Sequence, residues 1–230
     1  SYNYIVKEDT TTTPVDGVYT FFNLKLYEGT LVNNKYTVDT SNANQRFLIK
    51  NDFADTTTLQ VKVQNSSTDT TTTTYTKSTD LADVTSSSTV YYLEGAEDSQ
   101  YEVKFGDGVL GKALSTGNIV TLTYIVTSGA DSNGANSFTL SGTVGGFSDV
   151  SLTVNSKSAN GSDPESPASI RFNAPRQFAT QNRAVTAKDY ESRVKSIFSN
   201  AKSVQVWGGE DNATPVYGRV YISINPVAGA

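Results

Sequence analysis

The first 160 residues of this chain contain many short runs in which apolar residues alternate with polar ones or follow one another directly. The clearest is "TLQVKVQ" (58–64), where Leu59, Val61 and Val63 alternate with polar residues. Because successive side chains of a strand point to opposite faces, this run predicts a half-buried β-strand. Similar runs lie at 2–6, 18–29, 30–38, 46–50, 89–95, 101–105, 119–126, 137–142 and 149–154. Such closely spaced strands indicate an antiparallel β-sandwich or barrel-like region.

Turn residues lie between several of these runs. Asn33-Asn34 and Asp107-Gly108 are the dipeptides from which we expect hairpin turns. Threonine makes up twenty-one of the first hundred residues, with uninterrupted runs at 10–13 and 70–74. Threonine is β-branched and favours strands, and proline is scarce here, so these runs predict a structural surface rather than a glycosylated stalk.

The sequence changes character near residue 160. A Gly/Pro/Ser-rich linker at 158–167 precedes a segment with helical periodicity. A helix is predicted at 186–198, with Thr186 as N-cap, Asp189 in its first turn, and an apolar stripe formed by Tyr190, Val194, Ile197 and Phe198. A shorter helix at 165–175 is expected to end before Pro175. Strands are expected at 203–208 and 217–226.

The predicted fold is therefore mainly β with a smaller α+β part. We expect a Thr-rich antiparallel β region at 1–160, with a candidate subdomain boundary near 95–100, and an α+β domain at 161–230. A strong strand pattern runs almost to Ala230, so we expect that domain to be incomplete at its C-terminus. The chain starts at Ser1 and contains no methionine, which suggests a piece of a longer protein.

One motif raises the possibility of nucleotide hydrolysis. In "FGDGVLGKAL" (105–114), Gly106, Gly111 and Lys112 have the spacing of a phosphate-binding P-loop. However, Ala113 stands where a Ser or Thr would hold magnesium, and the following residues have a strand pattern instead of a helix. A strand, an Asp-Gly turn and a short return explain this stretch better.

Composition excludes several classes of site. The chain has no histidine and no cysteine, which excludes Cys/His zinc sites and catalysis through an imidazole. The acidic clusters at 51–55 and 94–98 lack the spacing of an EF-hand and are interpreted as solvated turns. Composition leaves carboxylate-based catalysis and a calcium site with oxygen ligands open. No such site is visible in the sequence, so we expect no catalytic residues, no cofactor, no metal and no small-molecule substrate.

Charge is unevenly distributed along the chain. Residues 1–163 contain ten Lys/Arg and eighteen Asp/Glu, a net charge of −8, whereas residues 164–230 contain eight and five, a net charge of +3. The overall charge of −5 argues against general binding to nucleic acid. The sequence contains no run of eighteen apolar residues, so it predicts no membrane-spanning helix. The basic C-terminal part is able to bind an acidic surface of another protein. The alternative is that the two parts of the chain simply neutralise each other.

Three stretches in order carry a resemblance to a known family. They lie at 101–136, 164–194 and 204–226, a little over a third of the chain. Together they resemble the baseplate wedge subunits of contractile-tailed, T-even-like bacteriophages, the baseplate J-like family. The Thr-rich first hundred residues contain no motif that matches this family.

The resemblance implies a structural protein and no enzyme. Proteins of this family form homodimers that join wedges into a continuous ring around the tail hub, and the ring is expected to open as the sheath contracts while its subunits stay joined. Their partners are other wedge proteins, including a small sheath-proximal subunit with a lysozyme-like fold. The implied location is the virion tail baseplate, after assembly in the host cytoplasm.

Aromatic and arginine side chains dominate many protein interfaces. The candidate protein-contact residues are Arg176, Arg183, Arg193, Trp207, Tyr217 and Arg219. Ordinary packing explains Trp207 equally, as it does the stripe residue Tyr190, and a local polar contact explains Arg183. The alternative function is a cell-surface or carbohydrate-binding β-domain without catalytic activity, suggested by the aromatic, Thr-rich region 1–160.

Overall fold

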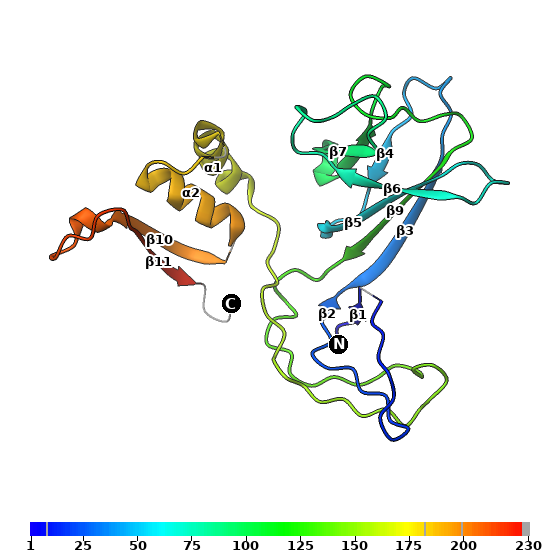
Figure 1. Ribbon diagram of the computed structural model, residues 1–230, viewed down its shortest axis with the longest axis horizontal. Coiled ribbons are helices and arrows are strands. Elements are labelled where there is room, and N and C mark those ends of the chain that lie inside the picture. Colours follow the sequence, from blue (N-terminus) through cyan, green and yellow to red (C-terminus); the bar gives the residue numbers. More distant parts are fainter. Residues whose placement is uncertain (8, 182, 199, 227–230) are drawn as a thin grey trace. The chain divides into compact units, whose positions relative to one another are not determined.

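The chain folds into two compact units, Ser1–Thr127 and Ser128–Ala230, which we call the N-unit and the C-unit. The computed structural model describes residues 1–7, 9–181, 183–198 and 200–226 (Figure 1). The predicted fold class, mainly β with a smaller α+β part, is confirmed. The domain boundary expected at 160/161 stays a prediction.

The N-unit is built on a seven-stranded sheet with the order β3-β9-β5-β6-β7-β8-β4 (Figure 1). Neighbouring strands are antiparallel except β6 and β7, which are parallel and joined by residues 78–89. The strands are β3 (Thr30–Thr37), β4 (Phe47–Ile49), β5 (Ala54–Gln64), β6 (Thr72–Lys77), β7 (Val90–Gly95), β8 (Tyr101–Phe105) and β9 (Ile119–Val126), with a 3₁₀ turn η1 (Glu97–Ser99) before β8.

The concave side of this sheet holds the hydrophobic core. Along β9, Val120, Leu122 and Tyr124 are fully buried, as alternation predicts. The predicted face of β5 is confirmed, since Leu59, Val61 and Val63 are also buried. The threonine run at 70–74 enters β6, where it pairs with β5 and leaves its hydroxyls near solvent. The core consists of Val38, Ile49, Leu59, Val61, Val63, Tyr75, Tyr91, Val103, Val120, Leu122 and Tyr124.

The sheet is nearly closed into a barrel. Its two end strands, β3 and β4, meet through the Tyr36 side chain, whose hydroxyl donates a hydrogen bond of 2.6 Å to the Leu48 carbonyl. The Tyr36 ring also packs edge-on against Phe47, with ring centroids 5.6 Å apart. Burial raises the pKa of the Tyr36 hydroxyl, which keeps it neutral and able to donate. A side chain therefore closes the gap that backbone pairing leaves.

The turn expected at Asn33-Asn34 is wrong. Both residues lie inside β3 and pair with Thr123 and Leu122 of β9 in an uninterrupted register. The Asn33 and Asn34 side chains bond across the sheet instead, Asn33 accepting from the Thr123 hydroxyl and Asn34 donating to Tyr124. The Asn pair therefore serves cross-strand pairing, a role that the dipeptide alone does not reveal.

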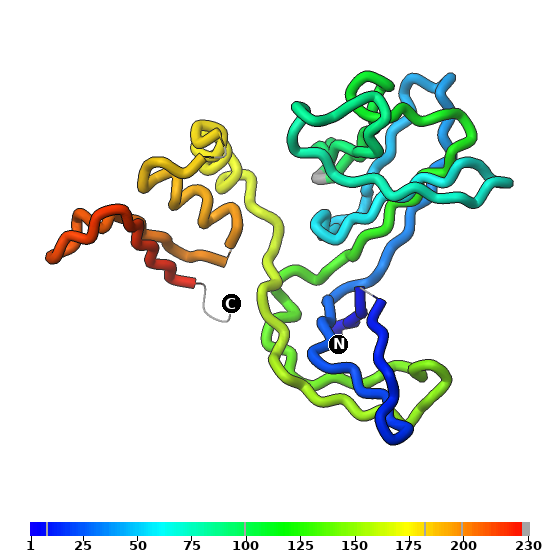
Figure 2. Tube along the Cα trace, viewed as in Figure 1, coloured from blue at the N-terminus to red at the C-terminus, as the bar shows by residue number. Residues whose placement is uncertain are grey.

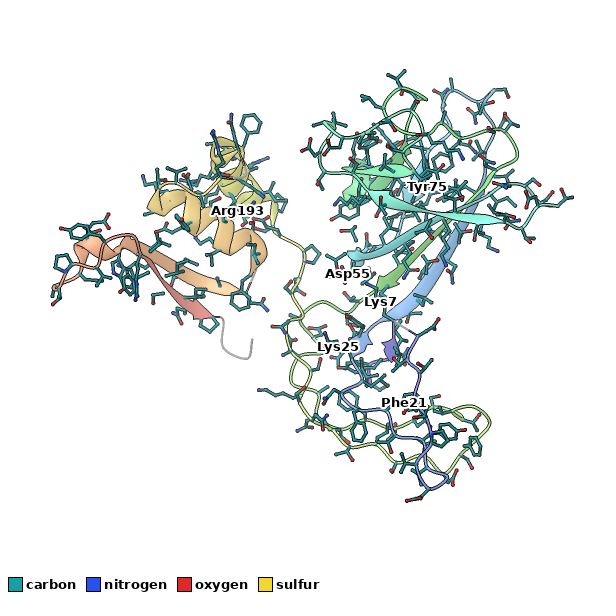
Figure 3. All side chains as sticks on the ribbon, in the orientation of Figure 1. Lys7, Phe21, Lys25, Asp55, Tyr75 and Arg193 are labelled. Atoms are coloured by element: carbon teal, nitrogen blue, oxygen red, sulfur yellow. The ribbon has the colours of Figure 1, made fainter. Side chains whose placement is uncertain are left out.

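The first thirty residues contain little regular structure. Strands β1 (Tyr4–Val6) and β2 (Leu26–Glu28) pair with each other, so the run at 18–29 is a strand only at its end. Between them, Val15 and Val18 form a tight turn across Asp16 and Gly17, both with positive φ. Phe21 lies in the segment that follows this turn (Figure 3). Phe21 and its neighbour Phe22 are exposed.

The C-unit begins with a long excursion, residues 128–166, that runs out and returns alongside itself (Figure 2). The strands expected at 137–142 and 149–154 are absent from these described residues, which have only a tight turn at Val144–Phe147. The two ends are held together: Asn133 bonds both backbone groups of Gly161, and Ser158 exchanges hydrogen bonds with Gly134 and Ala135. The predicted linker at 158–167 is therefore anchored over its first half.

The remainder of the C-unit is α+β. It comprises α1 (Pro167–Thr180), α2 (Ala187–Ile197), β10 (Ala201–Gly208), a 3₁₀ turn η2 (Gly209–Asp211) and β11 (Val220–Pro226). Helix α2 lies along β10, and β10 and β11 form an antiparallel hairpin (Figure 1). The expectation that the first helix ends before Pro175 is wrong, because α1 continues through Pro175 to Thr180. It ends where Gln181 adopts a left-handed conformation.

Candidate protein-contact surface

The start of α2 is fixed by a complete capping box. The Thr186 hydroxyl accepts from the Asp189 backbone N–H at 3.3 Å, and the Asp189 carboxylate accepts from the Thr186 N–H at 2.9 Å. This confirms the predicted N-cap. The Thr186 bond, followed by one from the Val185 N–H, lowers the pKa of Asp189, and the charge of Arg183 adds to the effect.

Arg183 is engaged next to this cap. Its Nη2 donates to the Gln181 side chain at 2.9 Å, and its backbone N–H bonds the Thr180 carbonyl. The side chain remains exposed. These contacts are local, as expected from the alternative of a local polar contact, and the role of Arg183 in binding a partner stays a prediction.

The predicted apolar stripe of α2 is covered over only part of its length. Tyr190 and Val194 are half-buried, whereas Ile197 is 78% exposed. Arg193 lies on the same helix and is half-buried (Figure 3). Ile197 therefore does not share the partial burial of the other stripe residues, although the neighbouring Phe198 is half-buried.

The hairpin presents an aromatic pair. Trp207 of β10 and Tyr221 of β11 are partners in the strand register, and their rings stack with centroids 5.8 Å apart and an interplanar angle of 13°. The Trp207 Nε1–H donates to the Asn212 side chain at 2.9 Å, so the polar group of the indole is satisfied. Trp207 and Tyr221 are both half-buried, which leaves a flat apolar surface partly open to solvent.

The connection between β10 and β11 carries two more candidates. Tyr217 is 82% exposed, and Arg219 precedes β11 with its backbone carbonyl bonded to the Gly209 N–H at 2.8 Å. A Cβ at Gly209 would lie 2.0 Å from the Val216 carbonyl oxygen, so the loop needs glycine there. The loop thus holds Tyr217 and Arg219 beyond the end of the hairpin that carries Trp207.

Arg176 belongs to a different surface, the exposed face of α1. Its guanidinium lies 3.5 Å from the centroid of the Phe172 ring and also bonds the Phe172 carbonyl. The structure therefore groups Trp207, Tyr217 and Arg219 on the hairpin, and places Arg176, Arg183 and Arg193 on or beside the helices. Sequence reasoning missed Tyr221, although its position in an alternating run could have paired it with Trp207.

The stretch with P-loop spacing is a closed turn. The Asp107 carboxylate accepts from the Val109 and Leu110 N–H groups at 2.9 Å, and these bonds lower its pKa. The N–H groups of Gly111 and Lys112 bond the carbonyls of Thr85 and Ser88. The backbone donors that a phosphate would need are already used by this protein's own oxygens, and strand β9 follows the turn. The chain turns at Asp107-Gly108 as predicted, but the expected hairpin is wrong, because β8 pairs with β4 and β7 whereas β9 pairs with β3 and β5.

Within the described ranges, no group of three or more His, Cys, Asp and Glu side chains is placed to bind a metal ion. Neither described α-helix has the length and apolar character that crossing a membrane requires. The C-unit presents a set of exposed or half-exposed aromatic and arginine side chains on its helices, its hairpin and the connections between them. Such groups suit protein recognition.

Comparison with known proteins points to one family. Residues 186–230, which include α2, β10 and β11, match the family model described as "Baseplate structural protein gp6, C-terminal domain I". The chain is also 29% identical over 167 residues to the baseplate wedge protein gp6 of Enterobacteria phage T4. That similarity covers 63% of this chain but only 25% of the length of the T4 protein. The resemblance to baseplate wedge subunits, expected from three stretches of sequence, is confirmed.

Proposed function

We propose that this chain is part of a structural protein of a phage tail baseplate wedge, and that it works by binding other proteins and not by catalysis. One observation carries the proposal. The family match at 186–230 coincides with the α2–β10–β11 element that presents the Trp207–Tyr221 stack. An element that matches this family model and presents an open aromatic surface is suited to a place in an assembly.

On this proposal the protein forms a homodimer and joins wedges into a ring around the tail hub. Its other partners are wedge proteins, including a small sheath-proximal subunit with a lysozyme-like fold. The ring opens as the sheath contracts while its subunits stay joined. The protein is located in the virion baseplate and is assembled in the host cytoplasm. The resemblance to the wedge family supports this, and the charge difference between residues 1–163 and 164–230 allows complementary contacts.

The aromatic surface of the hairpin is the proposed contact with another wedge protein. Trp and Tyr contribute most where they are rigid and lose water on binding, at about 2 kcal/mol or more for each hot-spot residue. The stack holds both rings in place before binding, so little side-chain entropy is lost. Tyr217 and Arg219 extend the surface at the end of the hairpin.

Complementation tests this proposal. A phage that lacks its own wedge protein of this family is supplied with the full-length gene carrying Trp207→Ala and Tyr221→Ala together. We expect the titre to fall more than about tenfold, with unattached wedges accumulating in lysates seen by electron microscopy. The matched control, Trp207→Phe with Tyr221→Phe, keeps two rings and should largely restore assembly. If the alanine pair gives normal titres while the protein remains folded by circular dichroism, the contact surface is wrong.

A further inference from the structure

The chain contains two Asn-Gly dipeptides, Asn133-Gly134 and Asn160-Gly161, and the fold brings them together. They lie on opposite arms of the excursion, where its two ends run side by side (Figure 2). The Asn133 side chain accepts from the Gly161 N–H at 2.9 Å and donates to the Gly161 carbonyl at 2.8 Å. Residues 129–135 and 158–163, which we call the neck, therefore meet at these two dipeptides.

Asn-Gly dipeptides are prone to deamidation, because glycine has no side chain that hinders the reaction. The backbone nitrogen of the glycine attacks the side-chain carbonyl carbon of the asparagine, and the amide group leaves as ammonia with the proton of the backbone N–H. Water then opens the resulting succinimide ring at either carbonyl, which gives aspartate or isoaspartate. The reaction consumes only water, and it is slow while the backbone N–H is held in a hydrogen bond.

The folded protein protects Asn133 from this reaction in two ways. Its side-chain amide is held by both backbone groups of Gly161. The nitrogen that would have to attack it, that of Gly134, carries an N–H that donates to the Ser158 carbonyl at 2.8 Å. The reacting carbon and the attacking nitrogen of this dipeptide are therefore both fixed by hydrogen bonds across the neck.

Asn160 is protected less than Asn133. Its side chain is exposed, and the N–H of Gly161 donates to a side chain, that of Asn133, and not to a backbone carbonyl. Breaking this contact frees the nitrogen that attacks Asn160, whereas the Gly134 N–H stays bonded to Ser158. Asn133 and Gly161 are half-exposed, so water reaches the contact. A local opening of the neck therefore exposes Asn160 to deamidation first.

We propose that Asn160 is a deamidation site that the Asn133–Gly161 contact keeps closed, and that the modification makes opening of the neck irreversible. Isoaspartate carries its side-chain carbon in the main chain, so Gly161 is displaced by one bond and no longer meets Asn133 in register. Both products also place a new carboxylate directly before Gly161, and this group is charged at neutral pH. A brief opening of the neck is thus converted into a permanent one. The site depends on the neck alone and on no partner protein.

Peptide mapping by mass spectrometry measures the reaction directly. The 230-residue chain is incubated in mildly alkaline buffer, and deamidation is quantified separately at Asn133 and Asn160. Asn133→Ala removes both bonds to Gly161, and deamidation follows the population of the open neck, so Asn160 should react about tenfold faster. The matched control, Asn136→Ala, removes an exposed asparagine of the same excursion and should leave the rate at Asn160 unchanged.

Hydrogen exchange tests the irreversible step. The amides of Gly134 and Ser158, which bond across the neck, should exchange faster in the isoaspartate fraction than in unmodified protein, while those of β9 keep their protection. Asn160→Gln does not readily form the ring and should prevent both the reaction there and the loss of protection. Equal rates at Asn160 in the folded and the urea-unfolded chain, or no acceleration by Asn133→Ala, would overturn the site. Full protection of the neck in the isoaspartate fraction would overturn the irreversible step.

Discussion

Tyr36 bridges the two end strands of the N-unit barrel through both a hydrogen bond and a ring contact, so it is an informative residue to change. Tyr36→Phe removes the 2.6 Å hydrogen bond to the Leu48 carbonyl but keeps the ring contact with Phe47. One such bond contributes about 0.5–1.5 kcal/mol to the free energy of unfolding. Tyr36→Ala also removes the ring, and because Tyr36 is half-buried we expect a loss of about 3 kcal/mol, the low end for an aromatic residue.

Thermal unfolding can assign the loss to the correct unit. Trp207 is the only tryptophan and lies in the C-unit, so its fluorescence follows that unit. The tyrosine band of near-ultraviolet circular dichroism mostly follows the N-unit, which contains ten of the thirteen tyrosines. A loss of 1 kcal/mol lowers Tm by about 2–4 °C in a chain of this size. Tyr36→Phe should shift the circular dichroism transition and leave the tryptophan transition in place.

A second tyrosine provides the control. The Tyr92 hydroxyl also bonds a carbonyl, that of Leu110, but at 3.3 Å and on the turn after β8 rather than between the end strands. Tyr92→Phe should cost less than Tyr36→Phe. The reasoning is refuted if Tyr36→Phe leaves the circular dichroism transition unchanged. Equal shifts in both signals would mean instead that the two units unfold together.

Four further changes test other parts of the fold. Tyr124→Phe removes a fully buried hydroxyl that bonds Asn34 and Asn51, so we expect urea unfolding to show a loss of about 1–3 kcal/mol, and an unchanged midpoint would contradict this. Gly161→Ala places a Cβ 2.4 Å from the Gly129 carbonyl oxygen, so limited proteolysis should cut residues 136–157 faster than in the parent chain, and equal rates would argue against the anchoring. Thr186→Ala should destabilise α2 by about 0.5–2 kcal/mol. Because folding lowers the pKa of Asp189, the ionised carboxylate stabilises the fold fully above the ordinary value of 3.8, and this stabilisation is lost as pH falls through the lower folded value. Asp189→Asn removes the ionisable group, so Trp207 fluorescence should become less sensitive to acid in this range. An acid profile identical to that of the parent chain would contradict this role of Asp189.

The sequence correctly predicted the elements that depend on hydrogen bonds between nearby residues or on a regular alternation of apolar and polar residues. Thr186 and Asp189 determine the start of α2 through bonds within one turn, so the cap could be predicted without tertiary information. The alternation of Leu59, Val61 and Val63 determines the buried face of β5 in the same way. The turn at Asp107 was also foreseeable from Asp-Gly, but the hairpin expected there was not formed, because β8 and β9 pair with other strands.

Most of the wrong predictions concern segments whose conformation depends on pairing with a distant strand, and one concerns a proline inside a helix. The runs at 137–142 and 149–154 alternate like strands, yet no described strand pairs with them, and β-propensity without a partner ladder does not make a strand. Asn33-Asn34 resembles a turn in isolation but pairs with β9. Pro175 removes one backbone donor, and α1 still continues for five residues to Thr180.

The residues of the candidate contact surface could likewise be predicted only in part from the sequence. Sequence could select Trp207 and Arg219 by residue type, but Tyr221 becomes important only through the register that stacks it on Trp207. Alternation in β11 shows that Val220, Ile222 and Ile224 share a face, but not whether anything covers that face. α2 covers β10 and stops short of β11, so burial differs between two strands with equally apolar faces. Burial of a strand is thus decided by the element that packs on it, and this information lies outside the sequence of the strand itself.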